Sequence, residues 1–204
     1  MIKIMRKLYN WVLHWAHTKY GSLALFVLAF AESSFFPIPP DVLLIALAIS
    51  INKKAFKFAI ICSLGSIMGG IFGYYIGYEL WYVNNNFSGF ANLFFDYIPG
   101  FTETLFYKVV GLYNKYSFLI VFSAGFSPIP YKVFTITAGV TKINIFNFLL
   151  ASTISRSLRF FIVSGLIYKY GKPIKSYIDK YFDKLSLLFV ILIILGFVVI
   201  KYIF

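Results

Sequence analysis

Apolar residues run along almost the whole chain and are interrupted by short clusters of charged residues, prolines and asparagines. Three of the apolar runs, at 58–83, 145–168 and 185–204, have the roughly 20 residues that a helix needs to cross a bilayer. Two others, at 22–31 and 117–126, are about half that long, and each ends at a proline-rich motif. The pattern predicts an all-α membrane protein in which two segments enter the bilayer without crossing it.

The two proline motifs are copies of one pattern, Phe-x-Pro-Ile-Pro-x-charge-Val. Each position of the second copy lies 91 residues after its counterpart in the first, as Pro128 does after Pro37. The charged position changes sign between the copies, because Asp41 in the first becomes Lys132 in the second. The chain therefore contains an internal repeat, centred on charges within apolar surroundings.

The prolines predict the local backbone of each motif. Proline removes an amide donor and disfavours helix in the residue before it, so each motif breaks its helix and turns the chain back. Such backbone is tolerated at membrane depth only when it is buried in protein or lines a wet cavity. We therefore predict two re-entrant helical hairpins, at 22–51 and 117–141, which meet at a shared polar site. The prolines predicted to line this site are Pro37, Pro39, Pro128 and Pro130.

The remaining segments complete a single membrane domain, residues 1–204. Residues 1–20 alternate apolar and basic side chains at helical spacing, which predicts an amphipathic helix lying in the membrane interface. Residues 84–116 predict an outer loop followed by a second interfacial helix. Each hairpin is followed by a spanning helix, at 58–83 and 145–168, and the last span, 185–204, has no counterpart. Because one full span separates the hairpins, the second unit is inverted relative to the first.

Composition and charge agree with this topology. The chain of 204 residues is 60% hydrophobic with a net charge of +12, and its mean hydropathy is +0.82. The lysines lie between apolar runs, where they can meet anionic lipid headgroups, so we reject a nucleic-acid partner. Placing the N-terminus, 52–57 and 169–184 in the cytoplasm puts the basic loops inside.

Three further patterns were considered: a row of glycines, a pair of histidines and the motifs of hydrolases. Glycines recur at every fourth position of the first long span, a pattern that lets another helix approach closely; they are Gly65, Gly69, Gly73 and Gly77. His14 and His17 are too few for a closed metal site. The chain lacks the H-E-x-x-H and G-x-S-x-G motifs of hydrolases. We therefore expect no enzyme activity, no metal and no cofactor.

The charged residues in the apolar regions are the candidate site, because ionisable groups at membrane depth are costly and functional by default. Two interpretations of Asp41 and Lys132 stay open: a mutual ion pair that holds the hairpins together, or a direct role in transport. Glu32 is predicted to be a proton site, since a carboxylate in a low-dielectric cavity can load and release a proton. The alternative for Glu32 is a carboxylate in headgroup water.

Two arginines lie on the span that follows the second hairpin. Arg156 and Arg159 are three residues apart and so share one helix face. We predict that they clamp an anionic headgroup. The alternatives are snorkelling to the interface or pairing with Glu79 or Asp41.

The stretch Glu32 to Asp41 (ESSFFPIPPD), the glycine-rich span after it and residues 125–132 (GFSPIPYK) resemble the DedA family of VTT-domain membrane proteins, especially its YqaA-like branch. The resemblance covers about residues 20–168. It implies an inverted repeat of two re-entrant hairpins in the bacterial inner membrane, and a role in moving lipids between leaflets. The cargoes it implies are undecaprenyl phosphate or a phospholipid, with proton coupling in some members.

The family also implies acidic residues in the first hairpin, which Glu32 and Asp41 match. Many members carry two arginines in the second hairpin, where this chain has only Lys132, a point charge that cannot grip phosphate bidentately.

The residues and the resemblance together predict a flippase or scramblase for a lipid with an anionic phosphate headgroup. Lys132, Arg156 and Arg159 would offset the phosphate charge, and protonation of Glu32 or Asp41 would reduce repulsion. A non-transporting scaffold in membrane homeostasis and a small-solute or ion transporter on the same fold stay open. So do the cargo lipid, the direction and energy source of transport, and whether the protein is a homo-oligomer.

Overall fold

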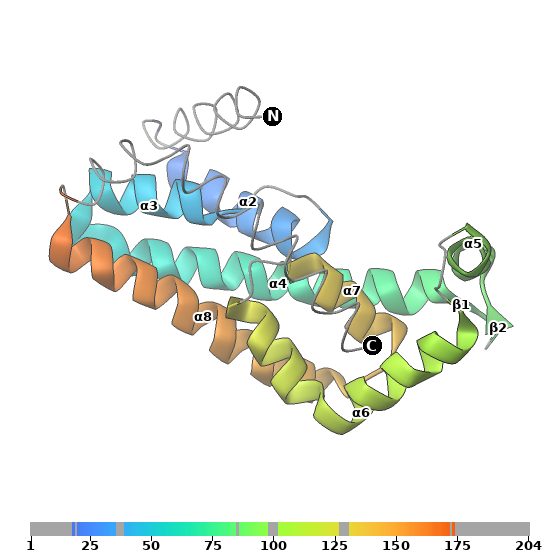
Figure 1. Ribbon diagram of the computed structural model, residues 1–204. Helices are drawn as coiled ribbons and strands as arrows, with labels where there is room; N and C mark the ends of the chain where they lie inside the picture. Colours follow the sequence, from blue (N-terminus) through green and yellow to red (C-terminus); the bar gives the residue numbers. More distant parts are fainter. Residues whose placement is uncertain are drawn as a thin grey trace.

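The computed structural model describes residues 18, 20–35, 39–84, 86–97, 102–126, 131–171 and 173 (Figure 1). Several predicted features lie outside these residues: most of the interfacial helix at 1–20, the last span at 185–204, His14, His17, Pro37, Pro128 and Pro130.

The first part of the described chain is two short helices followed by a long one. Helix α2 (Gly21–Ser34) has 14 residues and α3 (Asp41–Ser50) has 10, so they are about 21 and 15 Å long. Pro40 caps α3, where its missing amide is harmless, and Asp41 in the first turn suits the helix dipole. A 3₁₀ turn, η1 (Asn52–Lys54), then leads into α4 (Ala55–Trp81).

The second part begins with a small cap that the sequence analysis treated as loop. Strands β1 (Tyr82–Val83) and β2 (Asn86–Phe87) pair antiparallel, and α5 (Gly89–Tyr97) follows them. Asn84 has a positive φ of 51° in the tight turn between the strands, a conformation that asparagine tolerates.

The remaining helices are α6 (Glu103–Phe126), α7 (Tyr131–Val140) and α8 (Ile145–Tyr170). Tyr116 has non-helical angles (φ −127°, ψ 26°) and kinks α6, next to the predicted boundary between an interfacial helix and a hairpin. The Asn144 side chain accepts two amide hydrogen bonds at the start of α8, and Gly171, with φ 42°, ends it.

Within the described residues, three helical segments are long and apolar enough to cross a membrane: Asn52–Trp81, α6 and α8. Their outward faces carry large exposed apolar side chains, such as Leu64, Met68 and Phe72 on α4. A water-soluble protein rarely exposes apolar patches of this extent, whereas lipid covers them without cost. The protein is therefore an α-helical membrane protein, as its sequence predicts.

The glycines Gly65, Gly69, Gly73 and Gly77 of α4 contact two different helices, α2 and α7. A Cβ at Gly65 would lie 2.5 Å from the carbonyl oxygen of Phe26, and one at Gly69 would overlap that of Phe30, so this half packs on α2. A Cβ at Gly77 would likewise overlap the carbonyl oxygen of Ile136 on α7. One helix thus receives both α2 and α7 in close backbone contact, as Figure 1 shows.

Helix α8 lies beside α4 and receives the other two helices, α3 and α6. At the α6 contact, Gly125 lies against Ser155 with no room for a side chain. Helix α3 also contacts α4, so it lies against both long helices.

Two hydrogen bonds tie α4 and α8 together through the residues that precede them. The hydroxyl of Tyr74 donates to the carbonyl of Ile143 at 2.7 Å, just before α8 begins. At the other end the amide of Asn52 donates to the carbonyl of Ile167 at 3.0 Å. The two long helices form a fixed frame on which the shorter ones pack.

Candidate functional site

The ends of α2 and α7 meet beside the middle of α4 (Figure 1). Thr135 of α7 donates a hydrogen bond to the carbonyl of Ser33 at 2.9 Å. The Lys132 ammonium donates to the carbonyl of Phe35 at 3.1 Å. Since α2 is ending here, its last carbonyls lack helical partners, and α7 supplies donors for them.

The deepest polar contact is an ion pair between Glu32 of α2 and Arg156 of α8. Nη2 of Arg156 lies 2.7 Å from Oε2 of Glu32, and the side chains are 2% and 10% exposed. The backbone amide of Tyr131 also donates to Oε1 of Glu32, at 3.4 Å. We call Glu32 and Arg156 the buried pair; together with Tyr131 it connects α2, α7 and α8.

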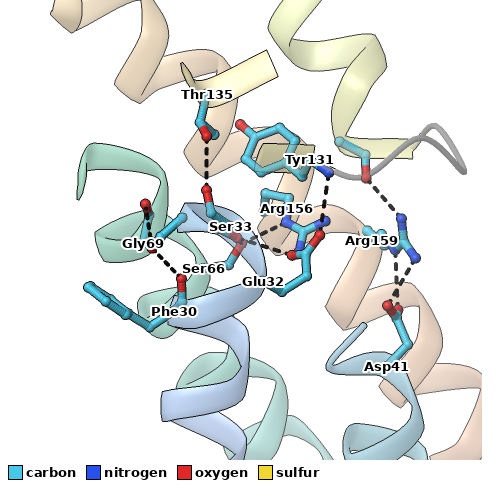
Figure 2. Close-up of polar contacts among 12 residues, drawn as sticks. Phe30, Glu32, Ser33, Asp41, Ser66, Gly69, Tyr131, Thr135, Arg156 and Arg159 are labelled. Carbon is cyan, nitrogen blue, oxygen red and sulfur yellow. Dashed lines mark hydrogen bonds and ion pairs between the residues drawn. The ribbon is translucent and has the colours of Figure 1, made fainter. Parts of the chain in front are cut away.

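Two serine hydroxyls close a ring around the buried pair (Figure 2). Nε of Arg156 donates to Ser66 at 2.7 Å, the hydroxyls of Ser66 and Ser33 are 2.7 Å apart, and Ser33 donates to Oε2 of Glu32 at 3.2 Å. Arginine can only donate and a carboxylate only accepts, so Ser66 must donate to Ser33. Each of the four side chains thus has at least two polar contacts within the ring.

Aromatic rings cover the Arg156 guanidinium on the sides that the ring of hydrogen bonds leaves open. Its Cζ lies 4.8 Å from the centre of the Tyr131 ring and 4.7 Å from that of Phe160. Such contacts attract a cation most strongly when it is desolvated. The environment therefore fixes Arg156 in place and excludes water from it.

A second ion pair, between Asp41 of α3 and Arg159 of α8, is more accessible. It is bidentate, with Nε to Oδ1 at 3.2 Å and Nη2 to Oδ2 at 3.0 Å. Arg159 also donates from Nη1 to the carbonyl of Gly125 at 3.4 Å, and the Arg159 and Asp41 side chains are 25% and 16% exposed. We call this the partly exposed pair.

Lys132 differs from both arginines because no carboxylate pairs with it within the part of the chain that the structure describes. The ion pair between Asp41 and Lys132, one of the two sequence interpretations, is therefore wrong. Asp41 begins α3, which packs on α8 and not on α7, so Arg159 reaches it instead. Pairing with Asp41, one of the alternatives for the two arginines, is confirmed for Arg159, whereas Arg156 pairs with Glu32, which was not among the predicted partners.

The two pairs belong to one cluster. Arg156 and Arg159 are three residues apart on α8, so both pairs lie on the same face of that helix. Among the predicted prolines Pro39 is half-buried, and Pro40 beside it is buried. No three His, Cys, Asp or Glu side chains of the described ranges come together in a way that could hold a metal ion.

Four residues of the site were missed by the sequence analysis: Ser33, Ser66, Tyr131 and Thr135. Their signal was present but weak. Ser33 directly follows Glu32, Tyr131 and Thr135 flank Lys132, and Ser66 is a hydroxyl inside the glycine row. Serine and threonine are also common in membrane helices as plain packing residues, so position alone could not single them out.

Comparisons with known proteins agree on one family. The model of the VTT domain matches residues 38–169. An uncharacterised protein of Haemophilus influenzae is 33% identical over 205 aligned residues, covering 98% of this chain and all of that protein. A second uncharacterised protein, from Histophilus somni, is 34% identical with the same coverage. No solved structure matches the chain significantly.

Proposed function

This chain belongs to the DedA family of VTT-domain membrane proteins, and on that premise we propose that it moves a phosphate-bearing lipid between the leaflets of the membrane. The resemblance of its motifs implies undecaprenyl phosphate or a phospholipid as cargo. The lipid headgroup would pass through the polar site while its acyl chains stay in the bilayer. The cell membrane of a bacterium, with the N-terminus in the cytoplasm, is the location that the basic loops favour.

We also propose that α2 with α3, and the second arm of α6 with α7, are re-entrant hairpins of an inverted repeat. Helices α2, α3 and α7 are each shorter than the hydrocarbon core of about 30 Å. The kink at Tyr116 leaves only the ten residues 117–126 in the inner arm of α6. The packing of α2 and α7 on each other and on α4 supports this symmetry, because inverted repeats place their broken helices at the repeat interface.

The observation that carries the proposal is the partly exposed pair. The guanidinium of Arg159 holds Asp41 by two parallel hydrogen bonds, and a phosphate group presents oxygens in the same geometry. A phosphate that enters the site can therefore replace Asp41 on Arg159. Protonation of Asp41 would assist the exchange, since a neutral acid holds arginine less strongly.

The buried pair has a different role in this scheme. Glu32 already accepts hydrogen bonds from Ser33, Tyr131 and Arg156, and aromatic rings cover Arg156. Exchange there would require the whole ring to open. We therefore assign Glu32 and Arg156 to holding α2, α7 and α8 together, and we assign the proton-accepting role to Asp41.

Transport of a labelled phospholipid in proteoliposomes tests this function. Replacing Lys132 by alanine should lower the rate by about tenfold or more, because the site loses the one cation that no carboxylate of the described residues neutralises. Lys169→Ala, an exposed lysine in the last turn of α8, is the matched control and should leave the rate unchanged.

Equal rates in both variants would contradict the proposed site. A rate that responds to a pH gradient in the wild type indicates proton coupling, whereas an indifferent rate indicates a passive scramblase. If folded protein moves no phospholipid or polyprenyl phosphate, the scaffold and small-solute alternatives gain support.

A further inference from the structure

Among the described residues, the charges of the site do not cancel. Two carboxylates and three cations lie in the site: Glu32, Asp41, Lys132, Arg156 and Arg159. Every other charged side chain of the described ranges is exposed. Since the two ion pairs are each neutral, the site as a whole carries one positive charge, and that charge belongs to Lys132.

Lys132 is held by a neutral group. Its ammonium donates to the Phe35 carbonyl, which leaves two of its three hydrogens for other acceptors. The side chain is half-buried, between the end of α2 and the start of α7. The contact with Phe35 is open to the surroundings, so an anion can reach the ammonium, and membrane-depth cations are usually compensated by one.

We propose that the site selects lipid headgroups that bring one net negative charge on phosphate, and this inference rests on the proposed lipid transport. A phosphate diester has that charge at any physiological pH. A phosphate monoester has it only in its singly protonated form. The monoester dianion would enter together with one proton, which binds either to a phosphate oxygen or to the Asp41 carboxylate. The O–H bond to this proton is the only covalent bond that forms or breaks.

Asp41 is the residue that sets this limit. While Asp41 is ionised, its carboxylate neutralises Arg159, and only the charge of Lys132 is left for the ligand. If Asp41 is neutral, Arg159 becomes a second uncompensated cation, and the site carries two positive charges. The charge on Asp41 therefore decides whether a monoanion or a dianion fits.

The wild-type protein gives the first test. Vesicles of phosphatidylcholine would contain trace amounts of labelled phosphatidylglycerol, a diester, or labelled phosphatidate, a monoester, with identical acyl chains. The second pKa of a phosphate monoester is about 6. Between about pH 5.5 and pH 8 we expect phosphatidate transport to fall on the order of tenfold, since one uncompensated charge at several ångströms costs that factor or more. Phosphatidylglycerol transport should change less than about twofold over the same range.

Asp41→Asn gives the second test, and we expect it to reverse the preference between the two lipids at high pH. The variant should carry phosphatidate at about pH 8 as fast as the wild type does at about pH 5.5, and it should carry phosphatidylglycerol more slowly. Glu79→Gln removes one negative charge from an exposed position and is the matched control, with unchanged selectivity. Lys132→Arg keeps the charge and should keep the wild-type preference. If Asp41→Asn does not fold, the wild-type comparison of the two lipids decides alone.

The outcomes separate the two proposals. If both lipids move with the same pH dependence, or Asp41→Asn keeps the wild-type preference, the charge selection is wrong and lipid transport stands. If neither lipid moves at any pH in folded protein, the proposed function fails, and the charge selection fails with it.

Discussion

Replacing Arg156 by methionine is expected to lower the free energy of unfolding by about 3–5 kcal/mol. The substitution leaves the Glu32 carboxylate 10% exposed and without its counter-charge, and it removes the donor to Ser66. Removing one partner of a buried ion pair is costly because the other charge remains desolvated. Chemical denaturation of the purified protein in detergent would measure the loss.

A double variant that also replaces Glu32 separates the effect of an unpaired charge from the effect of lost packing. Glu32→Leu combined with Arg156→Met removes both charges, and the double variant should recover most of the stability, since apolar replacement of a whole buried pair is often neutral. A double-mutant cycle then gives the coupling energy. Arg159→Met is the matched control, with a smaller loss because that side chain is 25% exposed. A loss below about 1 kcal/mol for Arg156→Met would show that the pair is solvated.

Gly139→Ala is expected to have an effect of similar size, for a steric reason. Its Cβ would overlap the carbonyl oxygen of Tyr74 and lie 2.8 Å from the backbone nitrogen of Tyr78. The obstacle is helix backbone, which cannot rotate away as a side chain can, so α7 must move away from α4. We expect a loss of about 3 kcal/mol or more in the free energy of unfolding.

Lipid transport by Gly139→Ala should fall as well, because α7 carries Tyr131 and Lys132 into the site. Gly111→Ala is the matched control: a Cβ there meets nothing within 4 Å. That variant should gain about 0.5–1 kcal/mol, since alanine favours helix over glycine. Equal stability of the two variants would show that α4 and α7 pack less closely than described.

Much of the architecture could be predicted from periodicity and length. The glycines four residues apart predicted a helix with a closely packed face, and Gly65 and Gly77 lie in such contacts. The apolar runs predicted the membrane class, and the proline motifs carried the family resemblance, which the comparisons confirm. The cap made by β1, β2 and α5 could not be predicted, because two-residue strands leave no period to detect.

The charged members of the site could be predicted, but not their pairing, and the serines, Tyr131 and Thr135 could not. A charge inside an apolar run is visible in the sequence, and this signal identified Glu32, Asp41, Arg156 and Arg159. Which charges pair depends on which helices touch. Repeat symmetry suggested Lys132 as the partner of Asp41, but α3 packs on α8, and that choice is made by tertiary contacts far apart in the chain.

The distance along the chain between paired charges has a consequence for how the protein is made. Glu32 and Arg156 are 124 positions apart, and Asp41 and Arg159 are 118 apart. At about 5–20 residues per second, the ribosome takes on the order of 10 s to cover that distance. Throughout this interval α2 and α3 hold carboxylates that have no counter-charge, and each costs about 3 kcal/mol at the bilayer centre.

A stalled nascent chain ending at residue 150 would reveal whether α2 is exposed to water before α8 has been synthesised. A cysteine replacing buried Ser34 should react with a water-soluble thiol reagent in that chain, and it should be protected once α8 has been synthesised. Helix α2, although it is synthesised long before α8, is thus expected to reach its final depth only when the arginines of α8 arrive.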